Sequence, residues 1–169
     1  MPATEFMHTV VVLDAQECYV AQQIGRFRAK LRRGDFKPRF GNLAAPLDPI
    51  EAFTEGMASE LAVARVLNVA PRLGDFMRGS ADMRLEGMEI EVKRVRYADA
   101  PLRVNVEHID EADVFVLVTG SLPEFRIVGC VSRRRLKAHG RLATVPSGEV
   151  FEMAQAELSP IEMLRGVDE

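Results

Sequence analysis

Two acidic side chains and a lysine occur close together in the middle of the chain. Asp82 is followed nine residues later by Glu91-Val92-Lys93. Two neighbouring carboxylates make a site for Mg²⁺, because this ion prefers oxygen ligands and keeps several of its waters. A lysine beside them would hold an attacking water or stabilise the charge that develops on a phosphate. These residue types therefore suit the hydrolysis of a phosphodiester bond.

The segment 81–96 must position these residues, and its pattern predicts a β-hairpin. Two apolar residues, Met83 and Leu85, alternate with polar ones, and Gly87 marks the turn. The returning strand carries its own apolar set, which consists of Met88, Ile90, Val92 and Val95. Because side chains alternate along a strand, we expect Glu91 and Lys93 side by side on the opposite face.

A helix predicted over residues 49–68 adds a third carboxylate. Proline is favoured in the first turn of a helix, and here Pro49 begins the segment. At 100° per residue Glu60 falls within the apolar stripe of this helix, whereas Glu55 falls on the opposite side. A buried carboxylate is costly unless it is paired or binds a metal. Glu60 therefore needs an explanation, either a paired cation or a metal, that Glu55 does not need.

The identities of the two strand carboxylates have competitors. Asp75 competes with Asp82, but Asp82 lies next to the hairpin and is preferred. Glu89 competes with Glu91, but the spacing to Lys93 favours Glu91. Alternating Glu and Lys also occur on exposed strands as a ladder of ion pairs that contributes little in water. The sequence therefore leaves open that Glu91 and Lys93 belong to such a ladder and have no catalytic role.

The remaining segments predict an α+β (α/β) fold with a central mixed sheet of four to five strands flanked by helices. Residues 8–13 are a short strand or an apolar lead-in, and Asp14 with Glu17 forms a capping box for a helix to about Arg33. Residues 34–49 are a connector and residues 97–112 a polar loop with a helical turn. The apolar runs 114–119 and 125–131 are buried strands. A helix capped by Ser132 follows at 133–138, and then a hairpin or loop and a helical segment near Pro160.

Asp82…Glu91-Val92-Lys93, preceded by Glu60 in a helix, resembles the PD-(D/E)XK nuclease superfamily. Residues 113–120 and 126–131 also resemble small phage and prophage proteins of undefined role in that superfamily. The resemblance implies a restriction-endonuclease-like core at 49–140, after an N-terminal helix and connector at 1–48 and before a C-terminal tail at 141–169. Ala81 replaces the proline of the family motif.

The resemblance also implies a role for each residue of the motif. Asp82 and Glu91 would be direct ligands of Mg²⁺ or Mn²⁺, and the Val92 carbonyl would be a third. Lys93 would position or activate the water. Glu60 would complete the acidic site directly or through a water.

Basic residues form two clusters although the net charge is −3. A phosphate backbone is attracted to such clusters, so a nucleic-acid face remains open alongside ordinary solvated helix faces. The residues expected to contact nucleic acid are Arg26, Arg28, Lys30, Arg32, Arg33, Arg96, Arg133, Arg134 and Arg135.

Composition limits the class of protein. The 169 residues are 47% hydrophobic and 28% charged, which fits one globular domain, and no apolar run approaches the ~20 residues of a membrane span. We expect no signal peptide, reduced thiols at Cys18 and Cys130, and a cytoplasmic location in a bacterial host. The three histidines have no zinc-like spacing.

Three functions follow in order of preference. The first is a metal-dependent nuclease, with DNA as the favoured substrate and with a homodimer or a phage or host protein helping target recognition. The second is a non-catalytic adaptor that binds nucleic acid or protein on the same fold. The third is a structural or assembly protein of α+β type.

Overall fold

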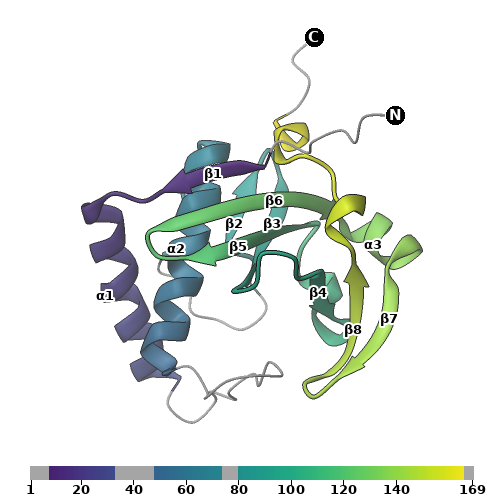
Figure 1. Ribbon diagram of the computed structural model, residues 1–169, viewed down its shortest axis with the longest axis horizontal. Coiled ribbons are helices and arrows are strands. Elements are labelled where there is room, and N and C mark those ends of the chain that lie inside the picture. The colour runs from purple at the N-terminus through teal and green to yellow at the C-terminus, as the bar shows by residue number, and fades with distance from the viewer. Residues whose placement is uncertain (1–7, 33–47, 74–79, 166–169) are drawn as a thin grey trace.

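A computed structural model describes residues 8–32, 48–73 and 80–165 of the chain. Two helices, α1 (Ala15–Leu31) and α2 (Pro49–Leu67), lie side by side and cover one part of a five-stranded sheet (Figure 1). A second sheet of three strands lies beyond the far end of the first. The predicted α+β class with a mixed sheet and flanking helices is therefore confirmed.

The five-stranded sheet has the order β1-β6-β5-β3-β2. Its β3 and β5 strands run parallel, and every other neighbouring pair runs antiparallel. The strands are β1 (Thr9–Val12), β2 (Met83–Leu85), β3 (Met88–Val95), β5 (Val114–Ser121) and β6 (Glu124–Ser132). The predicted strands at 114–119 and 125–131 are confirmed, and so is the short strand near the N-terminus.

The middle of the sheet is buried on both faces, which explains why the sequence of β5 is a continuous apolar run. Val116 and Val118 pack into one cluster with the apolar side of α2. Phe115 and Leu117 point the other way, into a second cluster that reaches the smaller sheet. The β3 side chains follow the same alternation, because Val92 pairs with Val116 in the parallel register.

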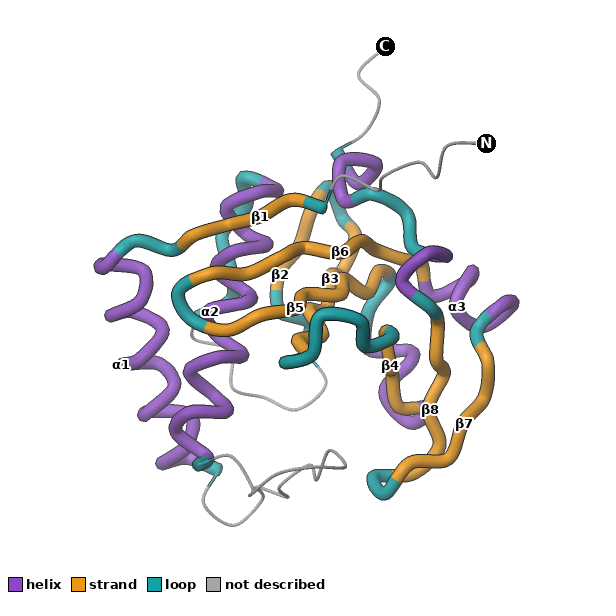
Figure 2. Tube along the Cα trace, viewed as in Figure 1, coloured by secondary structure: helices purple, strands orange, loops and turns teal. Residues whose placement is uncertain are grey.

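The two helices contact each other through a small residue. α2 lies between α1 and the sheet, and Figure 2 shows the two helices running alongside each other. At Gly25 an added Cβ would lie 2.7 Å from the Cα of Thr54, so this crossing requires glycine. The capping box predicted at Asp14 and Glu17 is confirmed. A further tie joins Glu17 to Arg65, which also donates to the Val12 carbonyl.

The smaller sheet has the order β4-β8-β7 and is antiparallel throughout. Its strands are β4 (Leu102–Asn105), β7 (Arg141–Val145) and β8 (Gly148–Met153). Helix α3 (Arg133–His139) connects the sheets, and Ser132 caps it as predicted by accepting from the Arg135 N–H. Short 3₁₀ helices lie at Val106–Glu111, Gln155–Glu157 and Ile161–Leu164.

Two sequence predictions need correction. Residues 97–112 contain β4 as well as a 3₁₀ helix. The sequence did not predict this strand, because its four residues are too few to show a clear period. Glu55 is also buried, and its carboxylate accepts from the Leu122 N–H at 3.1 and 3.3 Å. Helix α2 is covered by α1 on one side and by the sheet on the other, so a single apolar stripe did not describe it.

Several expectations fall outside the described residues. They concern the end of the first helix near Arg33, most of the connector, and Asp75. The C-terminal segment joins the core, because Ser159 forms an antiparallel bridge with Cys130. The two cysteines are free thiols, and burial raises the pKa of Cys130 to about 11. None of the helices described here combines the length and the apolar character needed to cross a membrane.

The helix crossing yields a direct stability prediction. Gly25→Ala would place its Cβ 2.2 Å from Thr54 Oγ1 and 2.7 Å from Thr54 backbone atoms, so the helices must separate. We expect a loss of about 1–3 kcal/mol in the free energy of unfolding, measured by urea denaturation.

Gly56→Ala is the matched control. Gly56 lies inside α2, and an added Cβ meets no atom within 4 Å. Alanine there should stabilise the protein by roughly 0.5–1 kcal/mol, because glycine is the poorer helix former. Equal effects of both substitutions would show that the crossing does not depend on Gly25.

Candidate functional site

The candidate site begins where β2 no longer pairs with β3, which continues with β5 on its other edge. The antiparallel register pairs Met83 with Ile90, and Asp82 is the next residue outward. The Asp82 N–H donates to the Ile90 carbonyl at 3.0 Å. Its carboxylate then accepts from the Val92 N–H at 2.7 Å, in the place where a backbone carbonyl would continue the ladder. The strand edge therefore fixes the Asp82 side chain.

The same edge presents the Val92 carbonyl. The N–H and C=O of one strand residue point to the same neighbour, so the Val92 carbonyl is directed to the side from which its N–H meets Asp82. This is the side of β3 that faces away from β5. A carbonyl oxygen and a carboxylate are thus offered along one edge.

Glu91 and Lys93 project from the face of β3 opposite Ile90, as predicted. The Lys93 Nζ lies 2.8 Å from Glu91 Oε1, and both side chains are about four-fifths buried, with exposed fractions of 21% and 18%. The pairing follows from the two-residue period of the strand. It leaves the ammonium group beside the acidic residues of the edge.

Glu60 comes to the site from α2 and is held by Arg28 of α1. The Arg28 guanidinium donates from Nη1 to Glu60 Oε1 at 2.9 Å and from Nη2 to Oε2 at 3.2 Å. This two-pronged contact is the geometry that guanidinium and carboxylate prefer. The predicted contact of Arg28 with nucleic acid therefore needs correction, because its guanidinium is already engaged and little exposed.

The three carboxylates influence one another. Burial, followed by repulsion from Glu60 and Glu91, raises the pKa of Asp82 well above its usual range, against the opposing effects of the Val92 N–H and Lys93. Burial also raises the pKa of Glu60, although Arg28 opposes the shift. The ionised cluster is therefore costly as it stands, and perturbed groups of this kind gather at functional sites.

The donor chemistry of this cluster fits a hard divalent cation. Carboxylate oxygens and the Val92 carbonyl are the ligands that Mg²⁺ takes. Within the described segments, however, no group of three or more Asp, Glu, His or Cys side chains is arranged to hold a metal ion. The reason is visible in the contacts: Glu91 is paired with Lys93 and Glu60 with Arg28. A metal would have to draw Glu91 away from Lys93.

The competing glutamate has a different environment. Glu89 pairs with Arg72 at 2.7 Å and with Arg84 at 3.7 Å, while its backbone N–H donates to Asp113. Arg72 also donates to the Ala81 carbonyl, which ties the start of β2 to β3. Glu89 thus braces the hairpin, and Glu91 is the carboxylate that lies near Asp82.

The basic segments are less available than their sequence indicated. Arg133 pairs with Asp113, Lys137 with Asp110, and Arg135 donates to Ser159. On α1, Arg26 and Lys30 are exposed, and Arg32 lies 5.9 Å from the ring centre of Phe53. Arg134 and Arg96 are exposed, and Arg33 lies outside the described residues.

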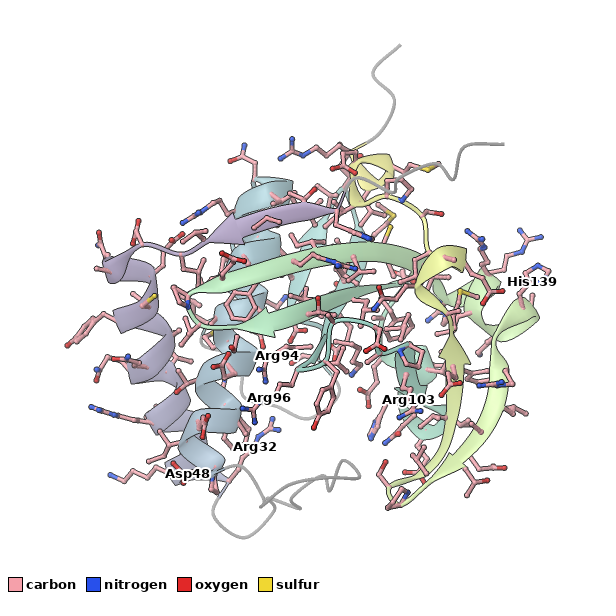
Figure 3. The ribbon with its side chains drawn as sticks, viewed as in Figure 1. Arg32, Asp48, Arg94, Arg96, Arg103 and His139 are labelled. Atoms are coloured by element: carbon pink, nitrogen blue, oxygen red, sulfur yellow. The ribbon has the colours of Figure 1, made fainter. Side chains whose placement is uncertain are left out.

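A small pocket that the sequence did not indicate lies beyond the end of β3. It is lined by Glu51, Glu55, Arg94, Arg96 and Ser121. Arg94 donates to the Gly120 carbonyl at 3.0 Å and lies 3.5 Å from Glu55, and burial lowers its pKa. Figure 3 shows Arg94 and Arg96 beside α2, with Arg32 nearby and Arg103 on the side of β4. The signal was available, because Arg94 follows the partly buried Val92 by two residues and therefore lies on the same face of the strand.

Comparison of the chain with models of protein families and with curated proteins finds no match to either. Its function must therefore be argued from the residues and their geometry.

The electrostatics of the cluster predict an unusual stabilising substitution. Asp82→Asn keeps an oxygen for the Val92 N–H and removes a charge that burial, Glu60 and Glu91 all disfavour. At pH 8 we expect a gain of about 0.5–2 kcal/mol in unfolding free energy.

The pH dependence has a definite sign. A carboxyl whose pKa is raised on folding costs stability as the pH rises through that range, whereas below its unfolded pKa of about 3.9 both states are protonated. The advantage of Asp82→Asn should therefore shrink toward pH 4, as measured by urea denaturation. Asp99→Asn, at an exposed position, is the control with no expected gain. Destabilisation by Asp82→Asn at pH 8 would contradict this description of the cluster.

Proposed function

We propose that this protein is a metal-dependent nuclease that hydrolyses phosphodiester bonds in nucleic acid, with DNA favoured. The observation that carries the proposal is the convergence of Glu60, Asp82, Glu91 and Lys93 at the free edge of β3. The charges of these residues interact, as the raised pKa values of Asp82 and Glu60 indicate, although the residues come from separate parts of the chain. The resemblance of the motif to PD-(D/E)XK nucleases supports the same assignment.

The metal would be held by Asp82, Glu91 and the Val92 carbonyl. Bound Mg²⁺ or Mn²⁺ would polarise the scissile phosphate and lower the pKa of a water. Asp82 is well suited to this task, because the Val92 N–H of β3 fixes its carboxylate. Cation binding would relieve the repulsion that the cluster experiences without it.

Lys93 would act on the water and the phosphate. Its ammonium lies 2.8 Å from Glu91, so it stands at the site without needing to move far. An ammonium group donates hydrogen bonds to an attacking water and to the oxygens on which negative charge develops. The side chain is mostly buried, which strengthens such contacts relative to bulk water.

Arginines at the same end of β3 support a polyanionic substrate. Arg96 is exposed three residues after Lys93, which corresponds to about 10 Å along an extended strand. Arg94 lines the same small pocket as Arg96. Arg26, Lys30 and Arg134 provide further exposed charge for the backbone. The free thiols of Cys18 and Cys130 fit the cytoplasm of a bacterial host, where we place the protein.

Cleavage assays with matched variants test this proposal. Single-stranded, double-stranded and branched DNA, and RNA, are incubated with Mg²⁺ or Mn²⁺ and with EDTA. We expect metal-dependent cleavage that falls by about 10²–10³-fold in Lys93→Ala and in Glu91→Gln. Glu89→Gln, on the same strand face, and Lys137→Ala, on α3, should remain within a few-fold of the wild type. Equal losses in Glu91→Gln and Glu89→Gln would remove the assignment of Glu91.

A non-catalytic adaptor is the second candidate. It is favoured by the pairing of Glu91 with Lys93 and of Glu60 with Arg28, which leaves the cluster closed in the described structure. Calorimetry separates the two functions. Absence of Mn²⁺ binding together with retained nucleic-acid binding that Arg96→Ala weakens would establish the adaptor and exclude the nuclease.

A further inference from the structure

The short segment that joins the two sheets is held in a fixed shape. Residues 96–101 connect β3 with β4. The side-chain amide of Gln155 donates to the Ala98 carbonyl at 2.8 Å and to the Ala100 carbonyl at 2.9 Å. The Ala100 N–H donates to the Tyr97 carbonyl at 3.3 Å, which closes a turn of four residues. The backbone of this connection is therefore held from within and from outside.

Gln155 is itself anchored to the larger sheet. Its side-chain oxygen accepts from Nη2 of Arg126, on β6, at 3.1 Å. The glutamine thus links β6 to the connecting segment through both ends of its amide. Connections usually move more than the strands they join, whereas this one is tied to a strand of the core. Side chains that it exposes are presented from a rigid support.

This support exposes an aromatic ring next to a guanidinium. Tyr97 is 52% exposed, and Arg96 before it is exposed as well. Within the part of the chain that the structure describes, no hydrogen bond or ion pair engages the Arg96 guanidinium. An exposed ring can stack on an unpaired base, and a guanidinium beside it can hold the phosphate. Both groups are available at one turn.

A second group of arginines lies on the smaller sheet. Arg103 of β4 and Arg141 of β7 are both opposite Glu152 of β8, so the three side chains share one face. Nε of Arg103 donates to one Glu152 oxygen at 2.7 Å, and Arg141 donates to the other. The arginines are 51% and 77% exposed, whereas Glu152 is 8% exposed. A buried carboxylate thus orients two guanidiniums that face solvent.

The chain connects these two groups over a short distance. Arg103 follows Arg96 by seven residues, so their Cα atoms lie at most about 25 Å apart. Figure 3 shows Arg96 beside α2 and Arg103 on the side of β4. The exposed charges of this region are Arg96, Arg103 and Arg141 against one acid, Asp99. A strand of on the order of five nucleotides covers such a length.

We propose that Arg96, Tyr97, Arg103 and Arg141 form a binding surface for single-stranded DNA, on which Tyr97 stacks one unpaired base and the arginines hold phosphates. We call these four residues the single-strand surface. Duplex DNA lacks the stacking contact, because its bases already stack on one another. The inference rests on the proposed function for the reaction itself, and it deepens that function by naming an unpaired strand as the substrate.

Tyrosine fluorescence tests the stacking directly. The chain has two tyrosines and no tryptophan, and the second tyrosine, Tyr19, is 62% exposed on α1. Tyr19→Phe therefore leaves Tyr97 as the sole emitter, and Tyr97→Phe leaves Tyr19. Each variant is titrated in EDTA with a thymine oligonucleotide of about 15 nucleotides, and the signal is corrected for absorption by the DNA. We expect strong quenching in Tyr19→Phe and almost none in Tyr97→Phe.

Binding affinities, measured by fluorescence anisotropy of labelled DNA in EDTA, test the preference for single strands. Tyr97→Ala should weaken single-strand binding by at least about fivefold, because the stacking contact is lost. Binding of a duplex of the same length should stay nearly unchanged. Tyr97→Phe keeps an aromatic ring and should bind as the wild type does. Tyr19→Ala is the matched control for loss of an exposed tyrosine.

The salt dependence of the affinity tests the arginines of the smaller sheet. Arg103→Ala and Arg141→Ala should each lower the slope of log Kd against log salt concentration by about 0.7, because each loses one phosphate contact. Arg103→Lys keeps the charge and should keep the slope. Arg84→Ala is the matched control, because Arg84 is a 62% exposed arginine that pairs with a glutamate on another strand.

The outcomes separate this surface from the nuclease. Equal quenching in the two single-tyrosine variants, equal weakening of single-strand and duplex binding in Tyr97→Ala, or no binding by the wild type would overturn the single-strand surface, even if the protein cleaves DNA. Unchanged slopes in Arg103→Ala and Arg141→Ala would remove the smaller sheet from it. Quenching of Tyr97 without any metal-dependent cleavage would instead overturn the nuclease and leave the surface on an adaptor.

Discussion

The point at which β2 stops pairing with β3 governs the candidate site. Up to Met83 the two strands share a regular ladder, and at Asp82 a side-chain carboxylate takes over the hydrogen bond from the Val92 N–H. This exchange leaves the edge of β3 open while keeping its backbone rigid, because β5 pairs with the other edge along the whole of Ile90–Val95. An acidic group is thus fixed by a hydrogen bond from the strand backbone.

Helix packing supplies the counterpart to this edge. Glu60 is buried between α1 and the sheet, where an unpaired carboxylate would be severely destabilising. Arg28 makes that burial tolerable, and Gly25 makes the approach of Arg28 geometrically feasible. The cost of holding Glu60, Asp82 and Glu91 together is consequently met by the helix pair and the apolar core around Met57 and Val116.

The sequence predicted the elements better than their contacts. Both long helices, the hairpin, the two buried strands and the cap at Ser132 follow from local patterns of polarity, caps and turns. At the hairpin turn, Glu86 and Gly87 both have positive φ values of 48° and 88°, which an X-Gly pair anticipates. Local patterns contain no information on which distant side chains meet. Arg28 was therefore assigned to a surface and Glu55 to solvent, whereas α2 is covered on two sides.

The same distinction applies to the two glutamates that precede Lys93 on β3. Glu89 and Glu91 lie on one face of one strand, so the two-residue period does not show how their environments differ. Glu89 is met by two arginines, so its charge is neutralised locally, and it ties β3 to the start of β2. Glu91 has one lysine and stands among two other carboxylates, so its surroundings are left negative. A surplus of negative charge on a rigid, partly buried edge attracts a cation, and that surplus arises only when α2 and the end of β2 are placed beside β3.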